Sequence, residues 1–587
     1  MRFWKPALAF VVGVVPIAMW WFVLAYSKLG VNFGLGSLNF PTRITASIFA
    51  TFMLIAVVSA PLWRITFEAF TLAPGSRLAR DLETLTESRW VALLSFGAFA
   101  VAALVRGWVL RGAPLTDDES AYQFAASLLT EGRLWAESAP PEIRLFFDTV
   151  FIINDGKMYA QYPLGWPALL AVGMVTGLTP VLNPLLSAAT VPAVYGLGRH
   201  FAGPREGRIA GGLFIVSPMV ATAAATLMSH TAALAAITWA FWVVATRAEV
   251  KSPRWDALLA FFIGAAVLIR PGVGVGFGAP LVAWWLYVRA FRTGEGRVVR
   301  LASFAVVGSV LGALFFFINH EQTGSMWKLA YTRSLEYAQE NGYRFSAWSS
   351  PQKFMGGGGF YELTQVALAA LLRINQDFFG LPLSLLPLAA VAWSRRLMVL
   401  AVPCAAFTFF HFFAADVGVD TFAPVHFFEL AGPLTVLIAL GVGRWVDRGL
   451  GALVMAVLAT AWATVIPMRF WSIHLMAQDI IAPLELVEEK DLHEAVVFNV
   501  GLPLQCLDLS HHFVFMRPFN HPDLADDVVW VNHLSVQLDR ELARRAFPGR
   551  AAYLLVQRID CTLELMPLDA PEAERLAPPY PFINKPK

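Results

Sequence analysis

The amino-acid sequence predicts a polytopic α-helical membrane protein that ends in a small soluble α/β domain. Hydrophobic residues make up 57% of the 587 residues and charged residues only 15%, whereas a soluble protein carries roughly a quarter charged residues. Apolar runs near the ~20 residues that cross a bilayer as a helix recur along most of the chain. The composition turns polar only at about residue 468.

Thirteen apolar runs meet or approach the required length, so we expect about 13 transmembrane helices. The first follows a basic start but precedes no small-residue cleavage pattern, and it is expected to remain in the protein as a helix rather than to be removed as a signal. The runs lie near residues 7–26, 44–62, 90–110, 182–198, 209–229, 231–246, 256–270, 272–288, 301–319, 376–393, 397–414, 425–443 and 449–467.

The distribution of Lys and Arg decides whether the short, proline-containing segment 162–177 also crosses. If it dips in without crossing and the N-terminus is cytoplasmic, the inner segments hold 20 Lys and Arg in 72 residues and the outer loops 11 in 136. Crossing would remove this asymmetry, which is typical of membrane proteins. The loops 111–163 and 320–375 and the tail 468–587 are therefore expected outside the cytoplasm.

The chain is thus expected to divide into three parts. Residues 1–87 hold two additional helices and a cytoplasmic linker, 88–467 the main transmembrane domain, and 468–587 a soluble domain. The last part contains strand-like runs at 494–500, 527–534 and 551–559. Cys506 and Cys561 also lie there; a disulfide between them and two unpaired thiols are equally compatible with the sequence.

The stretch "LTDDESAYQF" places Asp117, Asp118 and Glu119 directly after a membrane run. Thr116 and Glu119 fit a capping box, in which acids of the first turn are favoured by the helix dipole. The capping box does not explain Asp117 and Asp118, whose charges repel each other and lose hydration beside a membrane. Acids in such a position are candidates for a functional site.

Other polar residues are expected at the same outer face. Arg270 lies in an Arg-Pro break between two spans, and it either binds a substrate or extends to lipid headgroups. His230 either caps a turn or binds a substrate, and the basic residues of the 319–346 segment are either ligands or ordinary solvated charges. His426 and Glu429 begin an outer-side span and are weaker candidates. The predicted substrate-binding residues are Tyr122, His230, Arg270, Lys328, Tyr331 and Arg333.

An enzyme at this face needs an activated donor that resides in the bilayer, because soluble nucleotide donors are scarce outside the cytoplasm. A polyprenyl phosphate-linked sugar meets this need. Its phosphate favours Arg or Lys, its tail an apolar groove, and the acceptor hydroxyl a carboxylate as general base. The net charge of +2 gives no reason to expect a nucleic acid partner.

Five motifs resemble the GT-C membrane glycosyltransferases, the superfamily of protein O-mannosyltransferases and of aminoarabinose and galacturonic acid transferases to lipid A. The resemblance covers roughly residues 88–345 and is looser beyond. The motifs are "DESAY" (118–122), "YPLGWPALLA" (162–171), "SPMVATAAATLMSH" (217–230), "GAAVLIRP" (264–271) and "NHEQTGSMW" (319–327).

The resemblance implies inverting transfer of a sugar from the lipid-linked donor to a lipid, glycan or protein hydroxyl at the outer face of the inner membrane. It assigns Asp118 as the general base or as an acid that binds the acceptor, and Glu119 as its neighbour that orients the substrate, with Asp117 as a further catalytic candidate. Arg270, with Lys328 or Arg333, holds the donor phosphate. Family members often have an acid where this chain has His230. No cofactor is expected, and a metal requirement is not defined.

Two other classes remain open from the sequence. A transporter or a flippase of lipid-linked sugars also needs many spans and buried charges, but it is expected to show internal repeats and charges near the middle of the membrane. A binding or assembly protein would use the C-terminal domain and need no base.

Overall fold

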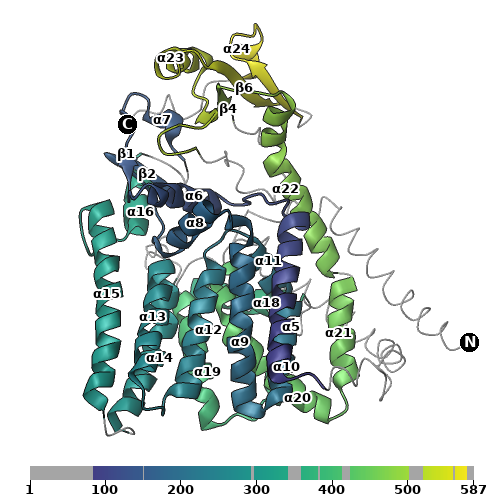
Figure 1. The fold of residues 1–587 in the computed structure, drawn as a ribbon. Helices are drawn as coiled ribbons and strands as arrows, with labels where there is room; N and C mark the ends of the chain where they lie inside the picture. Colours follow the sequence, from purple (N-terminus) through teal and green to yellow (C-terminus); the bar gives the residue numbers. More distant parts are fainter. Residues whose placement is uncertain are drawn as a thin grey trace, which may run out of the picture.

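The structure, a computed structural model, shows a helical bundle with a smaller region of sheets and short helices above one end (Figure 1). It describes residues 84–149, 151–291, 296–341, 359–380, 384–412, 424–463, 465–500, 520–558 and 562–577. The predicted spans 7–26 and 44–62, and with them nearly all of the predicted unit 1–87, lie outside the described residues, as do Cys506 and Cys561.

The bundle is built from long apolar helices that run roughly parallel to one another (Figure 1). α5 continues into a π-helical turn over Val105–Val109, and a 3₁₀ turn at Thr179–Val181 leads into α9. The helices are α5 (Glu87–Leu104), α9 (Leu182–Ala202), α10 (Pro204–Val216), α11 (Pro218–Ala225), α12 (His230–Arg247), α13 (Pro253–Ile269), α14 (Pro271–Phe291), α15 (Arg297–Thr323), α18 (Gly359–Asp377), α19 (Met398–Phe412), α20 (Ala431–Asp447), α21 (Gly451–Ala463) and α22 (Val465–Glu489).

Several of these helices expose apolar side chains as a membrane protein does. On α15, Val298 is 80% exposed and Val310 63%. Phe96 of α5 and Trp108 of the π-helical turn that follows it are exposed too. A soluble protein does not leave such faces open to water. Among the described residues, five segments are long and apolar enough to cross a membrane: Glu87–Val109, Thr179–Ala202, Pro271–Arg289, Arg297–Thr323 and Val425–Asp447.

The predicted spans agree with the helices in most places, and two differences have local causes. The run 209–229 is broken: α10 and α11 meet at an angle of 58°, where the Ser217 side chain caps α11 and Pro218 starts it. The predicted helix at 376–393 is wrong. α18 ends at Asp377, Gly380 has φ 78°, and the described residues before α19 form only the 3₁₀ turns Leu386–Ala390 and Arg395–Leu397.

The helix that the sequence missed, α18, occupies 359–377, almost entirely in the predicted outer loop 320–375, and lies among the bundle helices (Figure 1). That loop is therefore shorter than predicted. The total of about 13 spans stays a prediction, since two of its runs lie outside the described residues.

A layer of short elements covers one end of the bundle, which we call the α6 end. It includes a three-stranded antiparallel sheet of order β1-β3-β2. α8 has only 12 residues, about 18 Å of helix, and so is too short to cross the membrane, as predicted for 162–177. The elements are α6 (Asp117–Thr130), β1 (Ala136–Glu137), α7 (Arg144–Phe147), β2 (Ile152–Asp155), β3 (Lys157–Ala160), α8 (Gly165–Thr176) and α16 (Ala330–Glu340).

The C-terminal region contains a four-stranded sheet of order β5-β4-β6-β7, in which β7 alone is antiparallel to its neighbour. The three predicted strand runs contain β4, β5 and β6. Residues 465–489 form α22, so the globular part begins later than the predicted boundary at 468. Its elements are β4 (Ala495–Asn499), β5 (Val528–Asn532), α23 (Val536–Ala546), β6 (Ala551–Gln557), β7 (Leu563–Pro567) and α24 (Ala573–Leu576).

The C-terminal sheet and the layer at the α6 end share one hydrophobic cluster. Phe146 and Phe147 of α7 pack into the core that contains Phe498 and Leu554 of the sheet, and the Phe146 and Phe498 rings are 6.3 Å apart. Asn532 also donates hydrogen bonds to two backbone carbonyls of the 145–148 segment. The two predicted outer parts are therefore packed as one body above the bundle.

Candidate functional site

The first turn of α6 presents the three predicted acids. Thr116 and Glu119 form the capping box that their spacing predicts. Glu119 is fully buried, and its carboxylate accepts hydrogen bonds from the backbone N–H groups of Leu115 (2.7 Å), Thr116 (3.1 Å) and Leu227 (2.5 Å). Since these donors occupy both oxygens, Glu119 ties the start of α6 to the α11–α12 connection.

Asp118, the predicted base, is only partly buried and faces a group of tyrosines. The Tyr162 hydroxyl donates to Asp118 Oδ1 at 2.5 Å. The ring of Tyr162 lies 4.5 Å from that of Tyr122 and 5.5 Å from that of Tyr331, measured between centroids. Three chain segments that are far apart in the sequence therefore enclose one carboxylate.

Burial raises the pKa of Asp118, while the Tyr162 hydrogen bond and the nearby charge of Arg270 hold that pKa down. The carboxylate is thus less acidic than in water yet stabilised in its ionised form, which suits a proton acceptor near neutral pH. Burial raises the pKa of Tyr331 to about 12, so its hydroxyl stays neutral.

Arg270 reaches the same site because a proline follows it. Pro271 disfavours the helical conformation at the preceding residue; α13 ends at Ile269, and Arg270 is extended, with φ −145°. The guanidinium Nη1 donates to Ser229 Oγ at 3.1 Å, and Nε lies 3.4 Å from Glu429 Oε1. The Arg-Pro break thus places a cation at the α6 end.

Ser229 connects the cation to the tyrosines. Its hydroxyl is 2.9 Å from the Tyr122 hydroxyl and also accepts from Arg270. His230, the next residue, has Nδ1 3.0 Å from Glu429 Oε1. The structure therefore brings together four predicted residues around Asp118: Tyr122, His230, Arg270 and Tyr331.

Two predicted residues lie outside this group. Lys328 is paired with Glu336, at 2.9 Å. Arg333 is paired with Asp155 of β2 at 2.6 Å and with Glu340 at 3.0 Å. The Arg333–Asp155 pair joins α16 to the β2–β3 hairpin, while the other two pairs lie within residues 328–340. All three correspond to the ordinary-charge alternative for Lys328 and Arg333.

Asp117 points to the other side of α6. It lines a cavity of about 240 Å³ between α6 and the C-terminal domain, together with Ser120, Ala121 and Phe124 of the same helix. Asp118 does not line this cavity. Adjacent acids of one helical turn thus face two different environments, which a spacing argument does not distinguish.

Tyr162 and Ser229 are not among the individually predicted site residues, and Glu429 is only a weaker candidate from the sequence. Each had a signal: Tyr162 opens the motif "YPLGWPALLA", Ser229 precedes His230, and Glu429 is a carboxylate near the start of a span. Glu429 is fully buried between Arg270 and His230. A buried cation needs such a partner.

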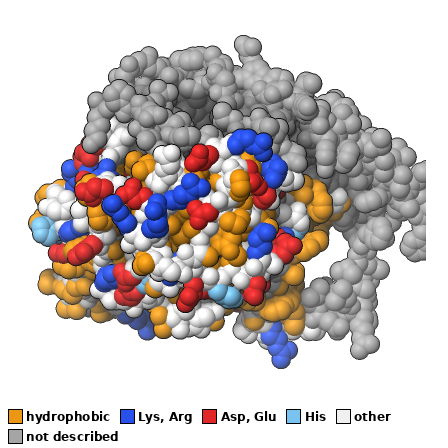
Figure 2. Space-filling model, turned by 90° about the horizontal axis from the view of Figure 1, so that it is seen from above, with side chains coloured by type: hydrophobic (Ala, Val, Ile, Leu, Met, Phe, Trp, Pro, Cys, Tyr) orange, Lys and Arg blue, Asp and Glu red, His pale blue; other side chains and the backbone are white. Residues whose placement is uncertain are grey.

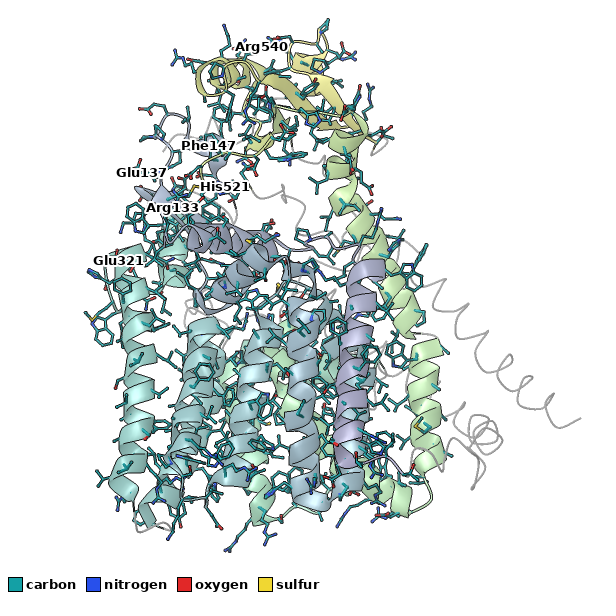
Figure 3. The ribbon with its side chains drawn as sticks, viewed as in Figure 1. Arg133, Glu137, Phe147, Glu321, His521 and Arg540 are labelled. Carbon is teal, nitrogen blue, oxygen red and sulfur yellow. The ribbon has the colours of Figure 1, made fainter. Side chains whose placement is uncertain are left out.

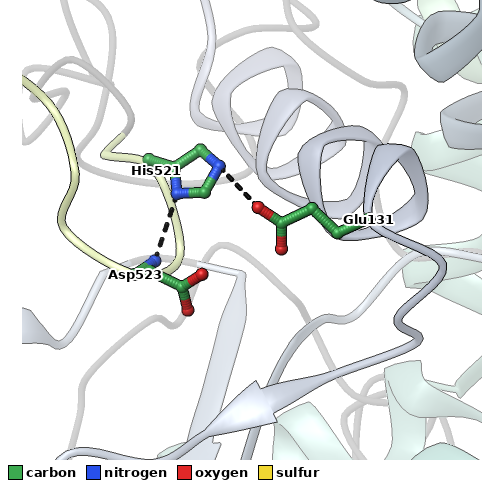
Figure 4. A group of neighbouring side chains, drawn as sticks. All are labelled: Glu131, His521 and Asp523. Carbon is green, nitrogen blue, oxygen red and sulfur yellow. Dashed lines mark hydrogen bonds and ion pairs between the residues drawn. The ribbon is translucent and has the colours of Figure 1, made fainter.

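A second polar group joins α6 to the C-terminal domain. His521 Nε2 is 2.9 Å from Glu131 Oε1, and His521 Nδ1 accepts from the Asp523 backbone N–H at 3.3 Å (Figure 4). The two carboxylates and the imidazole are close enough to share a cation. Arg133 already pairs with both carboxylates, so we describe these four residues as the α6 clasp.

No known family model matches the chain, and no curated protein does. In three dimensions it is similar to ArnT from Cupriavidus metallidurans bound to undecaprenyl phosphate, with a TM-score of 0.46 and 15% identity over 80% of this chain and 93% of that one. It is also similar to the Archaeoglobus fulgidus oligosaccharyltransferase in the apo form, with a TM-score of 0.36 and 13% identity over 67% of this chain and 58% of that one. It is similar as well to AglB from Archaeoglobus fulgidus in complex with an inhibitory peptide and a dolichol-phosphate. The TM-score is 0.34, with 12% identity over 81% of this chain and 75% of that one.

Proposed function

We propose that the chain is a membrane glycosyltransferase that moves a sugar from a polyprenyl phosphate-linked donor to a hydroxyl group of a lipid, glycan or protein. The observation that carries this proposal is the presence of Asp118 and Arg270 in one site, linked through tyrosines and Ser229. Transfer from a lipid phosphate needs a base for the acceptor and a cation for the departing phosphate.

In the proposed step, Asp118 accepts the proton of the acceptor hydroxyl. The acceptor oxygen forms a bond to the anomeric carbon, and the bond from that carbon to the phosphate oxygen breaks with inversion. Polyprenyl phosphate leaves with the bonding electron pair, and Arg270 stabilises its charge. The Tyr162 hydrogen bond holds the base in place for this transfer.

The guanidinium of Arg270 has donors left for a phosphate. Nε is paired with Glu429 and Nη1 donates to Ser229. Nη2 makes no hydrogen bond among the described residues, and it belongs to the planar fork that binds phosphate oxygens.

Large aromatic side chains buried along α14 disfavour the alternative of a transporter. The pair Arg289 and Asp256 is buried near the end of α14 remote from Arg270. Between the two arginines α14 buries Phe277 and Trp285 completely, and Phe277 stacks on Phe407 of α19 at 4.1 Å. A charged substrate would have to cross this aromatic layer.

We further propose that the α6 end faces away from the cytoplasm, in line with the Lys and Arg distribution. The helix connections rich in these residues, such as that between α20 and α21, lie at the opposite end of the bundle (Figure 1). Viewed from the α6 end, acidic and basic side chains are interspersed over the surface (Figure 2). Such a surface suits an aqueous compartment.

The test replaces the base without changing its shape. In Asp118→Asn, the amide does not accept the proton, so we expect the transfer product to fall by about a hundred-fold or more. The product is measured by mass spectrometry of the surface lipids and glycans of cells that carry the variant, compared with cells that lack the gene.

Asp491→Asn is the matched control, because Asp491 is 91% exposed at its side chain and lies far from the site in the chain. Both variants are first checked for equal amounts in the membrane. Unchanged product with Asp118→Asn would refute the assignment of the base.

A further inference from the structure

The cavity that Asp117 lines is separate from the Arg270 site and is bordered on one side by the C-terminal domain. It measures about 240 Å³ and is bounded by α6, by the segment from β1 to β2, by residues 520–524 and by the end of α23. Glu137, Phe147 and His521, three of its lining residues, lie where the α6 layer meets the C-terminal sheet (Figure 3).

The cavity and the Arg270 site lie against different faces of α6. Asp117, Ser120, Ala121 and Phe124 follow the i, i+3, i+4, i+7 spacing of one helical face and line the cavity. Asp118 and Tyr122, one turn apart, face the Arg270 site. A ligand in the cavity therefore lies against the same helical turn that carries the proposed base.

The cavity contains polar groups without partners. Ser120 Oγ and Thr149 Oγ1 are buried and make no hydrogen bond among the described residues. Asp117 is 9% exposed, and its carboxyl makes no hydrogen bond within the described part of the chain. Burial, and then the charge of Asp118, raise the pKa of Asp117 well above its usual range. Unsatisfied buried hydroxyls are uncommon in proteins.

The charge of the cavity limits what it can bind. Two acidic residues, Asp117 and Glu137, line it, and no Lys or Arg does so among the described residues. A phosphate or a carboxylated ligand would meet no Lys or Arg side chain of the described residues there. The walls also include the polar side chains of Ser138, Asn520 and His521. Most of the rest is apolar and partly aromatic, with Phe124, Phe147 and Phe547, which pack well against the C–H faces of a sugar ring.

We infer that this cavity is the acceptor subsite and holds one neutral or amino-substituted sugar ring of a glycan or glycolipid acceptor. The inference rests on the proposed function. The volume is below the roughly 300 Å³ at which pockets for larger ligands begin, so a single ring fits the space. The donor phosphate would then bind at the basic Arg270 site on one face of α6, and the acceptor sugar in the acidic cavity on the other face.

The test measures sugar binding without turnover. The full chain in lipid nanodiscs is titrated with methyl β-D-glucosaminide, methyl β-D-glucoside and methyl β-D-galacturonide, and saturation transfer from protein to sugar is recorded by NMR. We expect the first two to bind and the galacturonide not to bind. Thr149→Val, which removes an unpartnered hydroxyl, is expected to weaken binding about five-fold, the worth of one hydrogen bond.

A second variant closes the cavity. Ala546 is exposed at the end of α23 and lines the cavity, so Ala546→Trp is expected to abolish the signal. Arg545→Trp, at the exposed neighbouring position outside the cavity lining, is the control and is expected to bind normally. Absence of binding to the unaltered chain, or binding that Ala546→Trp leaves unchanged, would overturn the inference.

The same assay separates this inference from the proposed function. Asp118→Asn and Arg270→Ala are expected to keep sugar binding, since neither residue lines the cavity, while product formation is lost. If Arg270→Ala removes the sugar signal and Thr149→Val does not, the sugar occupies the Arg270 site and the subsite assignment is wrong.

Discussion

At the scale of single residues, three consecutive acids perform three different tasks. Glu119 is bonded to the backbone, Asp118 faces Tyr162 and the Arg270 site, and Asp117 lines the cavity under the C-terminal domain. The sequence favours Asp118 only through the family resemblance. Helical geometry alone, with successive residues turned by about 100°, explains why neighbours diverge so far.

Removing the Tyr162 hydroxyl tests how the proposed base, Asp118, is held. The hydrogen bond to Asp118 lowers the pKa of that carboxyl, so Tyr162→Phe raises it further. A general base must be ionised, and the acidic limb of the pH–rate profile therefore moves to higher pH. On that limb we expect about a ten-fold loss of rate, the worth of one hydrogen bond to a charged group.

Tyr159→Phe is the control, because Tyr159 of β3 packs with Ala330 and Tyr337 outside the Asp118 group. An acidic limb that stays in place in Tyr162→Phe would contradict the role given to this hydroxyl.

Arg270→Lys tests the proposed binding of the donor phosphate by the Arg270 guanidinium. Lysine keeps the charge but lacks the planar fork, so binding of a polyprenyl phosphate is expected to weaken by about ten-fold or more. The measurement is the shift in thermal unfolding of the detergent-solubilised protein as polyprenyl phosphate is added.

Arg297→Lys, at the exposed start of α15, should leave the shift unchanged. Equal shifts in the two variants would show that Arg270 does not bind the phosphate.

At the scale of elements, the site depends on how closely α8 approaches α13. A Cβ at Gly165 would lie 2.6 Å from the carbonyl carbon of Leu268, too close for any real contact. Gly165 begins α8, just after Tyr162, and Leu268 precedes Arg270 by two residues. The absence of one side chain therefore lets the two halves of the site meet.

Gly165→Ala is expected to destabilise the protein by about 1–3 kcal/mol through overpacking and to lower activity by separating Tyr162 from Arg270. Thermal unfolding in detergent measures the first effect and product formation the second. Gly212→Ala is a matched control in α10, where nothing lies within 4 Å of the added carbon; it should stabilise slightly. Equal stability of Gly165→Ala and the parent protein would refute the close approach.

The failed prediction at 376–393 has an element-scale cause as well. Hydropathy reports whether a segment is apolar, not whether its backbone continues as a helix. Gly380 adopts a left-handed conformation and Pro387 lacks an N–H group, so the apolar run turns instead of crossing. The helix forms upstream as α18, where the composition is less uniformly apolar.

At the scale of the whole molecule, the C-terminal domain is attached to α6 by the α6 clasp and by the phenylalanines of α7. The clasp is exposed and salt-sensitive, while the α7 contact is apolar. Arg133 holds the pKa of Asp523 below its usual range. The stability that the Arg133–Asp523 pair contributes is fully present above the ordinary pKa of an aspartate. It is lost as the pH falls through the lowered pKa of Asp523.

Arg133→Gln is expected to loosen the cover of the cavity without unfolding the domain. Hydrogen exchange should rise in residues 520–527 and stay slow in β4 and β6. Arg540→Gln, which breaks an ion pair with Asp569 inside the domain, should not change exchange at 520–527. Unchanged exchange there in Arg133→Gln would mean that α7 alone holds the domain.

The sequence by itself determined the membrane class, the end of the bundle where Asp118 and Arg270 lie, and the strands of the C-terminal domain. These follow from hydropathy, from the Lys and Arg distribution and from the Arg-Pro break, all of which act locally along the chain. Only the tertiary structure decided that Tyr162, Ser229 and Glu429 complete the site, that Lys328 and Arg333 are engaged elsewhere, and that Asp117 faces a separate cavity. Those outcomes depend on which side chains from distant segments pack together, and packing across α6 is not encoded in the spacing of any one segment.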